Sequence, residues 1–227
     1  MRTECAYEVE AVIFLAVIAV SYKKKNWLDL YMNRCFDQLL RAGLLFTFLD
    51  VAVRVLREYI FPGSFYVYNL SSVIPAVAMM GIAMFYFQYW HALSGHRLIL
   101  KSVRSLEMIL PAAVVTILDV TSPVTHLIFY YDRQGHYHAG SLEAIVLIVV
   151  NIYFAGACFV AFNRKTGLWI HRGISCLILC LVFDLSVVIQ FILMKNSILL
   201  MFYAMAFMIF VCYLLYQNLD RYSDRIS

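Results

Sequence analysis

The chain contains 227 residues, of which 63% are hydrophobic and 14% are charged. Soluble domains contain about 45–50% apolar and about 25% charged residues, so this composition excludes an ordinary water-exposed surface and predicts a protein embedded in a lipid bilayer. The formal net charge is +4, but no run of basic and aromatic residues accompanies it. We therefore expect no nucleic-acid partner and attribute the excess of Lys and Arg to membrane orientation.

Seven apolar segments predict seven transmembrane helices, because about 20 apolar residues are needed to cross a bilayer. The segments cover residues 7–22, 36–59, 67–90, 105–122, 142–162, 174–194 and 197–217. Acidic residues precede the first segment and a Tyr-Lys-Lys-Lys run follows it, which is not the pattern of a cleaved signal peptide. We expect an all-α membrane protein, a seven-transmembrane helix bundle, whose single domain covers residues 1–217.

The basic residues are divided unequally between the two sides of the predicted membrane domain. Twelve fall on the side that holds the C-terminus: Lys23, Lys24, Lys25, Arg34, Arg97, Lys101, Arg104, Arg164, Lys165, Arg172, Arg221 and Arg225. Five fall on or near the other side: Arg2, Arg54, Arg57, Arg133 and Lys195. Because Lys and Arg favour the cytoplasmic side, we predict a multi-pass protein of the plasma membrane with its N-terminus outside and its C-terminus in the cytoplasm.

The cysteines predict neither a disulfide framework nor a metal site. Of the six, only Cys5 lies outside in this topology, so no external pair exists. Cys176 and Cys180 are one helical turn apart, a spacing that suits a metal, but the sequence suggests no nearby His or third Cys. We interpret them as buried thiols and expect no metal and no cofactor.

A β-hairpin is predicted between spans four and five. After Ser122 and Pro123 the chain reads HLIFYYDRQGHYHAG, in which β-favouring residues precede a turn from Asp132 to Gly135. An irregular loop with aromatic residues at the lipid headgroups is the alternative interpretation. His136 and His138 would share one face of a strand, but without an identified third ligand we interpret both as surface residues.

Acidic residues within the predicted spans are the main functional signal, because a charge inside lipid costs about 2.5–3.5 kcal/mol on insertion scales. Asp50, Asp119 and Asp184 lie at similar depths and in similar contexts, TFLDVAV, TILDVTS and LVFDLSV. Arg54 follows Asp50 by one turn, so a structural ion pair is as good an interpretation of that pair as a ligand site. The other acids predict a partly hydrated cavity that opens to the outside.

The predicted ligand-binding residues come from the middle and outer halves of several spans. They are Glu8, Glu10, Asp50, Arg54, Asn69, Ser72, Asp119, Ser122, His126, Asn151, Asp184, Gln190 and Tyr203. Each polar residue among them could equally form a hydrogen bond between helices.

Three motifs carry a resemblance to a known family. The first is Asn33-Arg34-Cys35-Phe36, which leads into a span containing Leu49-Asp50-Val51. The second is Ser122-Pro123, followed by Leu127-Ile128-Phe129-Tyr130-Tyr131-Asp132, Gly135-His136-Tyr137-His138 and a Gly, and the third is Tyr216-Gln217-Asn218 with Asp224-Arg225-Ile226-Ser227. Together they resemble the seven-helix input region attached to many GGDEF-type diguanylate cyclases of Gram-positive bacteria. His138 and Ala139 depart from the Arg-Gly pair of that family, and Ile226 and Ser227 depart from its Leu-Thr pair.

The resemblance implies a sensor module that binds a small extracellular ligand and controls a cytoplasmic diguanylate cyclase domain, which makes cyclic di-GMP. It also implies a homodimer, because diguanylate synthesis joins two catalytic domains across a two-fold axis. Residues 218–227 would begin the signalling helix, and the chain itself would not be an enzyme. The alternative is a small proton-linked or solute transporter. The apolar cytoplasmic half-spans, ISCLILCL, ACFVAF and FVCYLLY, favour the receptor.

Overall fold

The protein is described by a computed structural model over residues 3–22, 30–94, 103–132, 136–163, 168–193 and 199–217. Within these ranges the helices are α1 (Thr3–Ser21), α2 (Leu30–Val55), η1 (Leu56–Ile60), α3 (Phe65–Leu93), α4 (Val103–Thr125), α5 (Ala144–Phe162), α6 (Leu168–Leu193) and α7 (Leu199–Gln217). The strands are β1 (Phe129–Tyr131) and β2 (Tyr137–Ala139). The prediction of an all-α fold with one hairpin between the fourth and fifth long helices is confirmed.

The second long helix starts earlier than predicted, while the helical stretch ends close to the expected position. It begins at Leu30, six residues before the expected start at residue 36, and its last turn widens into the π-helix η1. The early start follows from packing, because the side chain of Asn33 is buried and accepts a hydrogen bond from the Tyr216 hydroxyl of α7. A polar first turn can therefore join the bundle although it is not apolar.

Three helices in the described part of the chain are long and apolar enough to cross a membrane: Phe65–Leu93, Met108–Thr125 and Ala144–Phe162. Large apolar side chains also point away from the bundle, and Val20 and Val124 are 86% and 85% exposed. Exposure of that kind is unfavourable in water and favourable in contact with lipid tails. Both observations indicate a membrane protein.

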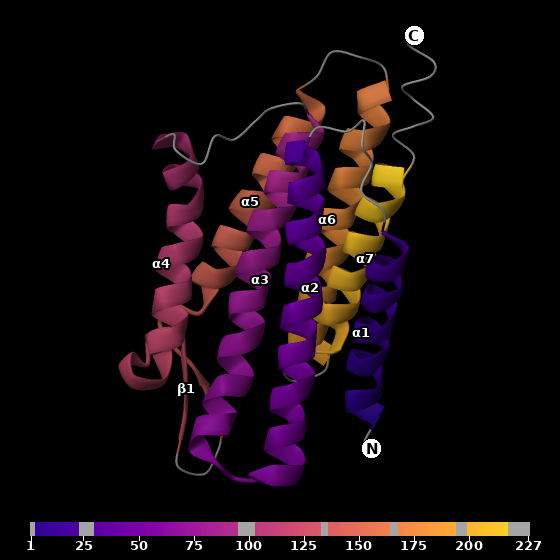
Figure 1. The fold of residues 1–227 in the computed structure, drawn as a ribbon. Coiled ribbons are helices and arrows are strands. Elements are labelled where there is room, and N and C mark those ends of the chain that lie inside the picture. Colours follow the sequence, from indigo (N-terminus) through magenta and orange to yellow (C-terminus); the bar gives the residue numbers. More distant parts are fainter. Residues whose placement is uncertain are drawn as a thin grey trace.

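The helices form a bundle in which α3 has a central role (Figure 1). It packs on α2, α4 and α5, while α1 lies against α2 and α7, and α6 lies against α5 and α7. Two tyrosines of α3 reach the remaining helices: the Tyr86 hydroxyl donates to the carbonyl of Cys176 in α6 (3.4 Å), and the Tyr89 hydroxyl donates to the carbonyl of Cys212 in α7 (2.9 Å). Helix α4 stands at one side of the bundle.

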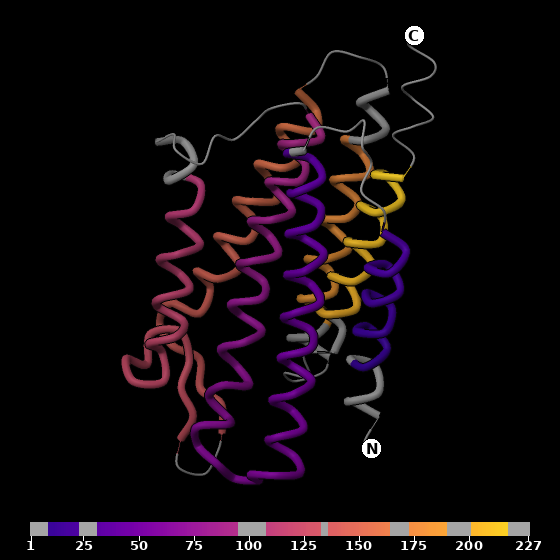
Figure 2. The backbone as a smooth tube through the Cα atoms, in the orientation of Figure 1, coloured from indigo at the N-terminus to yellow at the C-terminus, as the bar shows by residue number. Residues whose placement is uncertain are grey.

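Successive long helices run in opposite directions, as the backbone path shows (Figure 2). We call the end that carries η1, β1, β2 and the turn at residues 61–64 the hairpin end. Helices α3, α5 and α7 finish toward the other end, which we call the opposite end. Because the chain alternates in this way, α1 begins at the hairpin end and α7 leaves the bundle at the opposite end.

Candidate ligand-binding site

The side chain of Ser122 in α4 holds the hairpin against this helix by hydrogen bonds. Ser122 is fully buried, and its hydroxyl donates to the carbonyl of Phe129 (2.7 Å) and accepts from the backbone N–H groups of Ile128 (2.9 Å) and Phe129 (2.7 Å). These bonds use the donor and both acceptor sites of the hydroxyl. Ser122 was predicted to bind ligand, but its hydroxyl is fully occupied by the backbone.

The backbone between α4 and α5 turns through two unusual positions. His126 has a positive φ of 57°, which ends α4, and its exposed ring stacks on Tyr130 with centroids 4.4 Å apart. Gly140 ends β2, and a Cβ atom there would collide with the carbonyl of Leu127. Only glycine lets the returning strand lie this close to the end of α4.

Aromatic side chains connect the hairpin to α3. The strands pair with Tyr130 opposite His138 and Tyr131 opposite Tyr137. The Tyr131 hydroxyl shares a 2.7 Å hydrogen bond with the hydroxyl of Ser72, and its ring lies 5.7 Å from the ring of Tyr68. The hairpin is therefore held against the first turns of α3 by both polar and aromatic contacts.

The π-helix η1 places an arginine against the same turns of α3. The N–H of Phe61 donates to the carbonyl of Leu56, five residues earlier, at 2.8 Å. The Arg57 guanidinium lies 4.4 Å above the Tyr68 ring, and its Nη1 donates to the Ser71 hydroxyl at 3.4 Å. A cation over a ring face is attractive, so η1, α3 and the hairpin share one cluster at this end of the bundle.

Asp50 and Arg54 form the ion pair that their spacing predicts. The Arg54 Nε donates to the Asp50 Oδ2 at 3.0 Å, and the two side chains are 12% and 1% exposed. Removal of either partner would leave an isolated buried charge, which is strongly destabilising. The geometry fits the structural interpretation of the pair.

Asp119 is the buried acid closest to the hairpin. It is 1% exposed, and neither carboxylate oxygen has a hydrogen-bond partner among the described residues. The Oδ1 atom of Asn69, which is also buried, has none there either, while its Nδ2 donates to the carbonyl of Phe65 (2.9 Å). Buried acceptors without partners are costly, so this layer is suited to a group that carries hydrogen-bond donors or positive charge.

Tyr137 of β2 is half-buried, and its ring centroid lies 5.7 Å from that of Tyr131. Its hydroxyl donates to Glu143 Oε1 at 2.7 Å. Burial and then this hydrogen bond raise the pKa of the Tyr137 hydroxyl above its usual value, and the Asp119 carboxylate adds to the shift. Tyr137 therefore stays protonated at neutral pH. We call Asn69, Ser72, Asp119, Tyr131 and Tyr137 the polar layer.

Other predicted site residues lie in separate contacts. The Tyr203 hydroxyl donates to Glu10 Oε2 (2.7 Å) between α7 and α1, and both side chains are exposed. Asn151 of α5 is exposed, and its Nδ2 donates to the carbonyl of Leu147 in the same helix (3.0 Å), while Asp184 of α6 is half-buried. The side chains of Glu8 and Gln190 lie outside the described residues.

The contacts divide the three aspartates instead of joining them. Asp119 is on α4, Asp50 is on α2, and α3 lies between these two helices (Figure 1). Asp184 is on α6, which packs on α5 and α7. A single cavity shared by all three stays a prediction, and the polar layer contains only Asp119 of the three.

Several residues of this region were missed from the sequence, namely Arg57, Tyr68, Tyr131, Tyr137 and Glu143. The hairpin itself was predicted, and the structure pairs Tyr131 with Tyr137 across it. What was missing was the partner of that face, because strand alternation does not say which helix a hairpin covers.

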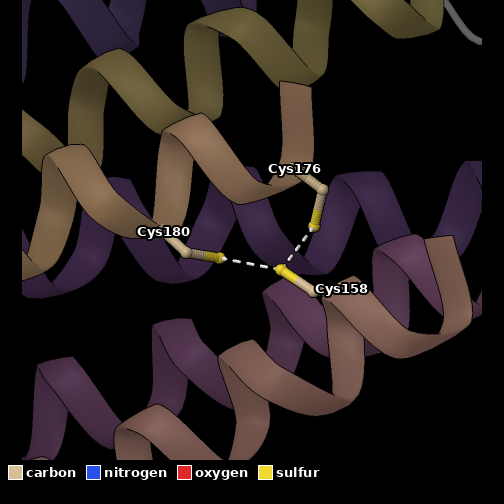
Figure 3. Close-up of side chains that lie close together, drawn as sticks. All are labelled: Cys158, Cys176 and Cys180. Atoms are coloured by element: carbon tan, nitrogen blue, oxygen red, sulfur yellow. Dashed lines mark hydrogen bonds between the residues drawn. The ribbon is translucent and has the colours of Figure 1, made fainter. Parts of the chain in front are cut away.

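Cys176 and Cys180 are buried, as predicted, but the expectation that no third Cys lies near them is wrong. Helix α5 brings Cys158 to them, and its Sγ lies 3.8 Å from Cys176 Sγ and 3.9 Å from Cys180 Sγ (Figure 3). The third cysteine could not be recognised from spacing, since Cys158 and Cys176 are on different helices.

Comparison with known proteins assigns neither a family nor an activity. No family model matches the chain, and no curated protein matches it. The likeness to cyclase input regions therefore rests on the three motifs alone, and the function must be argued from the geometry.

Proposed function

We propose that the chain is the sensor module of a receptor in the plasma membrane, with seven spans, the hairpin end outside and the opposite end in the cytoplasm. It binds a small organic cation in the polar layer and passes the change to a cytoplasmic output domain. The observation that carries the proposal is Asp119, a carboxylate buried against the hairpin without a hydrogen-bond partner in the described part of the chain.

A cation is the ligand that this arrangement favours. Its charge would compensate Asp119, its N–H or C–H groups would face the free oxygen of Asn69, and the tyrosine rings of the hairpin would supply cation–π contacts. Tyr131 and Tyr137 have ring centroids 5.7 Å apart in an edge-to-face arrangement, so one ring presents its face close to the other's edge.

The orientation rests on the basic residues. The chain segments between α1 and α2, α3 and α4, and α5 and α6 join helix ends that lie toward the opposite end. These segments contain Lys23, Lys24, Lys25, Arg97, Lys101, Arg164 and Lys165. Short basic connections favour the cytoplasm, which leaves the hairpin end outside.

Packing at the opposite end supports a receptor over a transporter. Phe36, Tyr89, Trp90 and Tyr216 are fully buried there, and the rings of Phe36 and Tyr216 stack with centroids 5.1 Å apart. A carrier needs a polar exit on this side. Closely packed aromatic rings instead suit a module that transmits a change in helix position.

Binding of organic cations tests the proposal. The chain in lipid nanodiscs would be titrated with ammonium, tetramethylammonium and choline, with sodium as the reference salt, while thermal unfolding is followed. A ligand at 100 times its Kd stabilises the folded state by about 2.7 kcal/mol. We expect one of the organic cations to stabilise the wild type and to have no effect on Asp119→Asn.

Asp37→Asn is the matched control, because Asp37 pairs with Arg41 (3.0 Å) on α2, away from the polar layer. It should respond to the cation as the wild type does. If Asp119 is instead protonated and binds no cation, Asp119→Asn should respond to the organic cations as the wild type does. That result, or no stabilisation by any of the three cations, would contradict the proposal.

The output part is tested with the complete gene in cells that lack other diguanylate cyclases. Cyclic di-GMP should change when the stabilising cation is added. Insertion of two glycines after Asn218, in the predicted signalling helix outside the described residues, should abolish this response and leave cation binding intact. An unchanged response would show that α7 does not transmit the signal.

A further inference from the structure

We infer that Cys158, Cys176 and Cys180 form a binding site for a thiophilic metal ion, Cu+ or Zn2+. The three sulfur atoms all lie within 4.8 Å of one another, and they are the one such group of His, Cys, Asp or Glu ligands found in the described ranges. Cys176 and Cys180 are one turn apart on α6, and Cys158 of α5 points between them (Figure 3).

The sulfur spacing fits a metal better than a disulfide. A metal–sulfur bond of about 2.3 Å places the sulfurs of a tetrahedral or trigonal site roughly 3.8–4.0 Å apart. The two separations from Cys158 are 3.8 and 3.9 Å. A disulfide requires about 2.05 Å, so its formation would need one helix to move toward the other. A metal ion fits both of these separations, and the three sulfurs already lie within 4.8 Å of one another.

The surroundings of the sulfurs suit a soft ion. Cys176 and Cys180 are 0% and 5% exposed, and the nearby rings of Tyr86, Phe154 and Phe183 exclude water. The Tyr86 hydroxyl shares its one proton between the Cys176 carbonyl (3.4 Å) and Cys176 Sγ (3.5 Å), so it is placed to act as an outer partner of a thiolate ligand. Three sulfur donors select Cu+ or Zn2+ over Mg2+ or Ca2+, which prefer oxygen.

Binding converts thiols to thiolates. Each cysteine releases one proton to solvent as its sulfur bonds the ion, and no oxidant or reductant is required. The cation compensates part of the thiolate charge in a site of low dielectric constant. The bound ion would join α5 to α6, one turn before α5 ends at Phe162. This inference does not depend on the ligand of the polar layer.

The test is metal binding by the purified, reduced chain in nanodiscs. Cu+ would be transferred from a colorimetric chelator in one arm, and Zn2+ in the other. We expect one ion per chain in at least one arm, with sulfur-only coordination at about 2.3 Å in X-ray absorption. The arm that binds more tightly identifies the ion.

Cys158→Ala and Cys176→Ala each remove a metal ligand. Each should weaken metal binding by more than the roughly 10–100-fold that is typical when only a hydrogen-bond partner of a ligand is removed. Cys35→Ala is the matched control, because Cys35 is an equally buried thiol on α2 and is not part of the group. Cys158 is only partly buried, so its variant should fold normally. Absence of binding in both arms, binding that survives Cys158→Ala, or a disulfide within the group would overturn the inference.

Discussion

The cluster at the hairpin end is built from oxygen atoms, whereas the cluster toward the opposite end is built from sulfur atoms and aromatic rings. Asp119, Asn69 and the hairpin tyrosines lie between α3, α4 and the hairpin, where β1 and β2 add main-chain groups to the helices. Cys158, Cys176 and Cys180 lie between two regular helices. An organic cation is thus favoured at one end and a soft metal ion at the other.

The largest expected effect comes from Arg54, in the last turn of α2. Arg54→Met leaves Asp50 buried without its salt bridge, which should destabilise the fold by about 3–5 kcal/mol. Reversible unfolding in detergent would measure it. The double variant Asp50→Leu with Arg54→Met should recover most of this loss, because it removes both charges. If the double variant is less stable than the single one, the pair is not primarily structural.

A smaller effect is expected from the anchor of the hairpin. Ser122→Ala removes one donor and two acceptor contacts with the buried backbone of residues 128 and 129, at a cost of about 1–3 kcal/mol. Hydrogen exchange should become faster at Ile128 and Phe129. Thr121→Ala is the control, since Thr121 is exposed and bonds only its own helix. Equal exchange in both variants would show that Ser122 does not hold the hairpin.

The contact between the hairpin and α3 should contribute less to the free energy of unfolding than the Ser122 hydrogen bonds do. Tyr131→Phe keeps the ring and removes the 2.7 Å hydrogen bond to Ser72, so we expect a loss of about 0.5–1.5 kcal/mol in unfolding free energy. Tyr130→Phe, on the other face of β1, is the matched variant and should change the stability little. The reverse order of effects would mean that the hairpin presents its other face to α3.

The smallest effect is expected at Asp184, and it separates one shared cavity from two distinct sites. Asp184 lies on α6, which packs on α5 and α7, whereas the hairpin packs on α3 and α4. Asp184→Asn should therefore leave stabilisation by organic cations unchanged, in contrast to Asp119→Asn. If both variants lose the effect equally, the aspartates act in a single cavity.

Much of the fold was predictable because local signals specify it. Apolar runs located the long helices, and the turn from Asp132 to Gly135, of which only Asp132 is described, located the hairpin between β1 and β2. The π-helix at Leu56–Ile60 was not predicted, since it widens a turn without any Pro or Gly. Its effect is to place Arg57 over Tyr68, a contact that depends on tertiary packing.

The sites were predicted less completely for a related reason. Depth along a helix can be counted from sequence, so Asp50, Asp119 and Asp184 could be placed in similar layers. Rotation about the helix axis and the choice of neighbouring helix cannot be counted in this way. The order of packing therefore separates Asp119 from Asp184 and brings Cys158 to Cys176 and Cys180.

The most direct test of the account is the orientation of the two ends, because the polar layer must face the outside and the cysteine group must lie toward the cytoplasm. His136→Cys in the hairpin and Asn163→Cys at the end of α5 give two exposed positions at the two ends, in a background with Cys5→Ala. Intact cells would be treated with a membrane-impermeant maleimide. We expect His136→Cys to be labelled in intact cells and Asn163→Cys only after the membrane is permeabilised, and the opposite pattern would contradict the account.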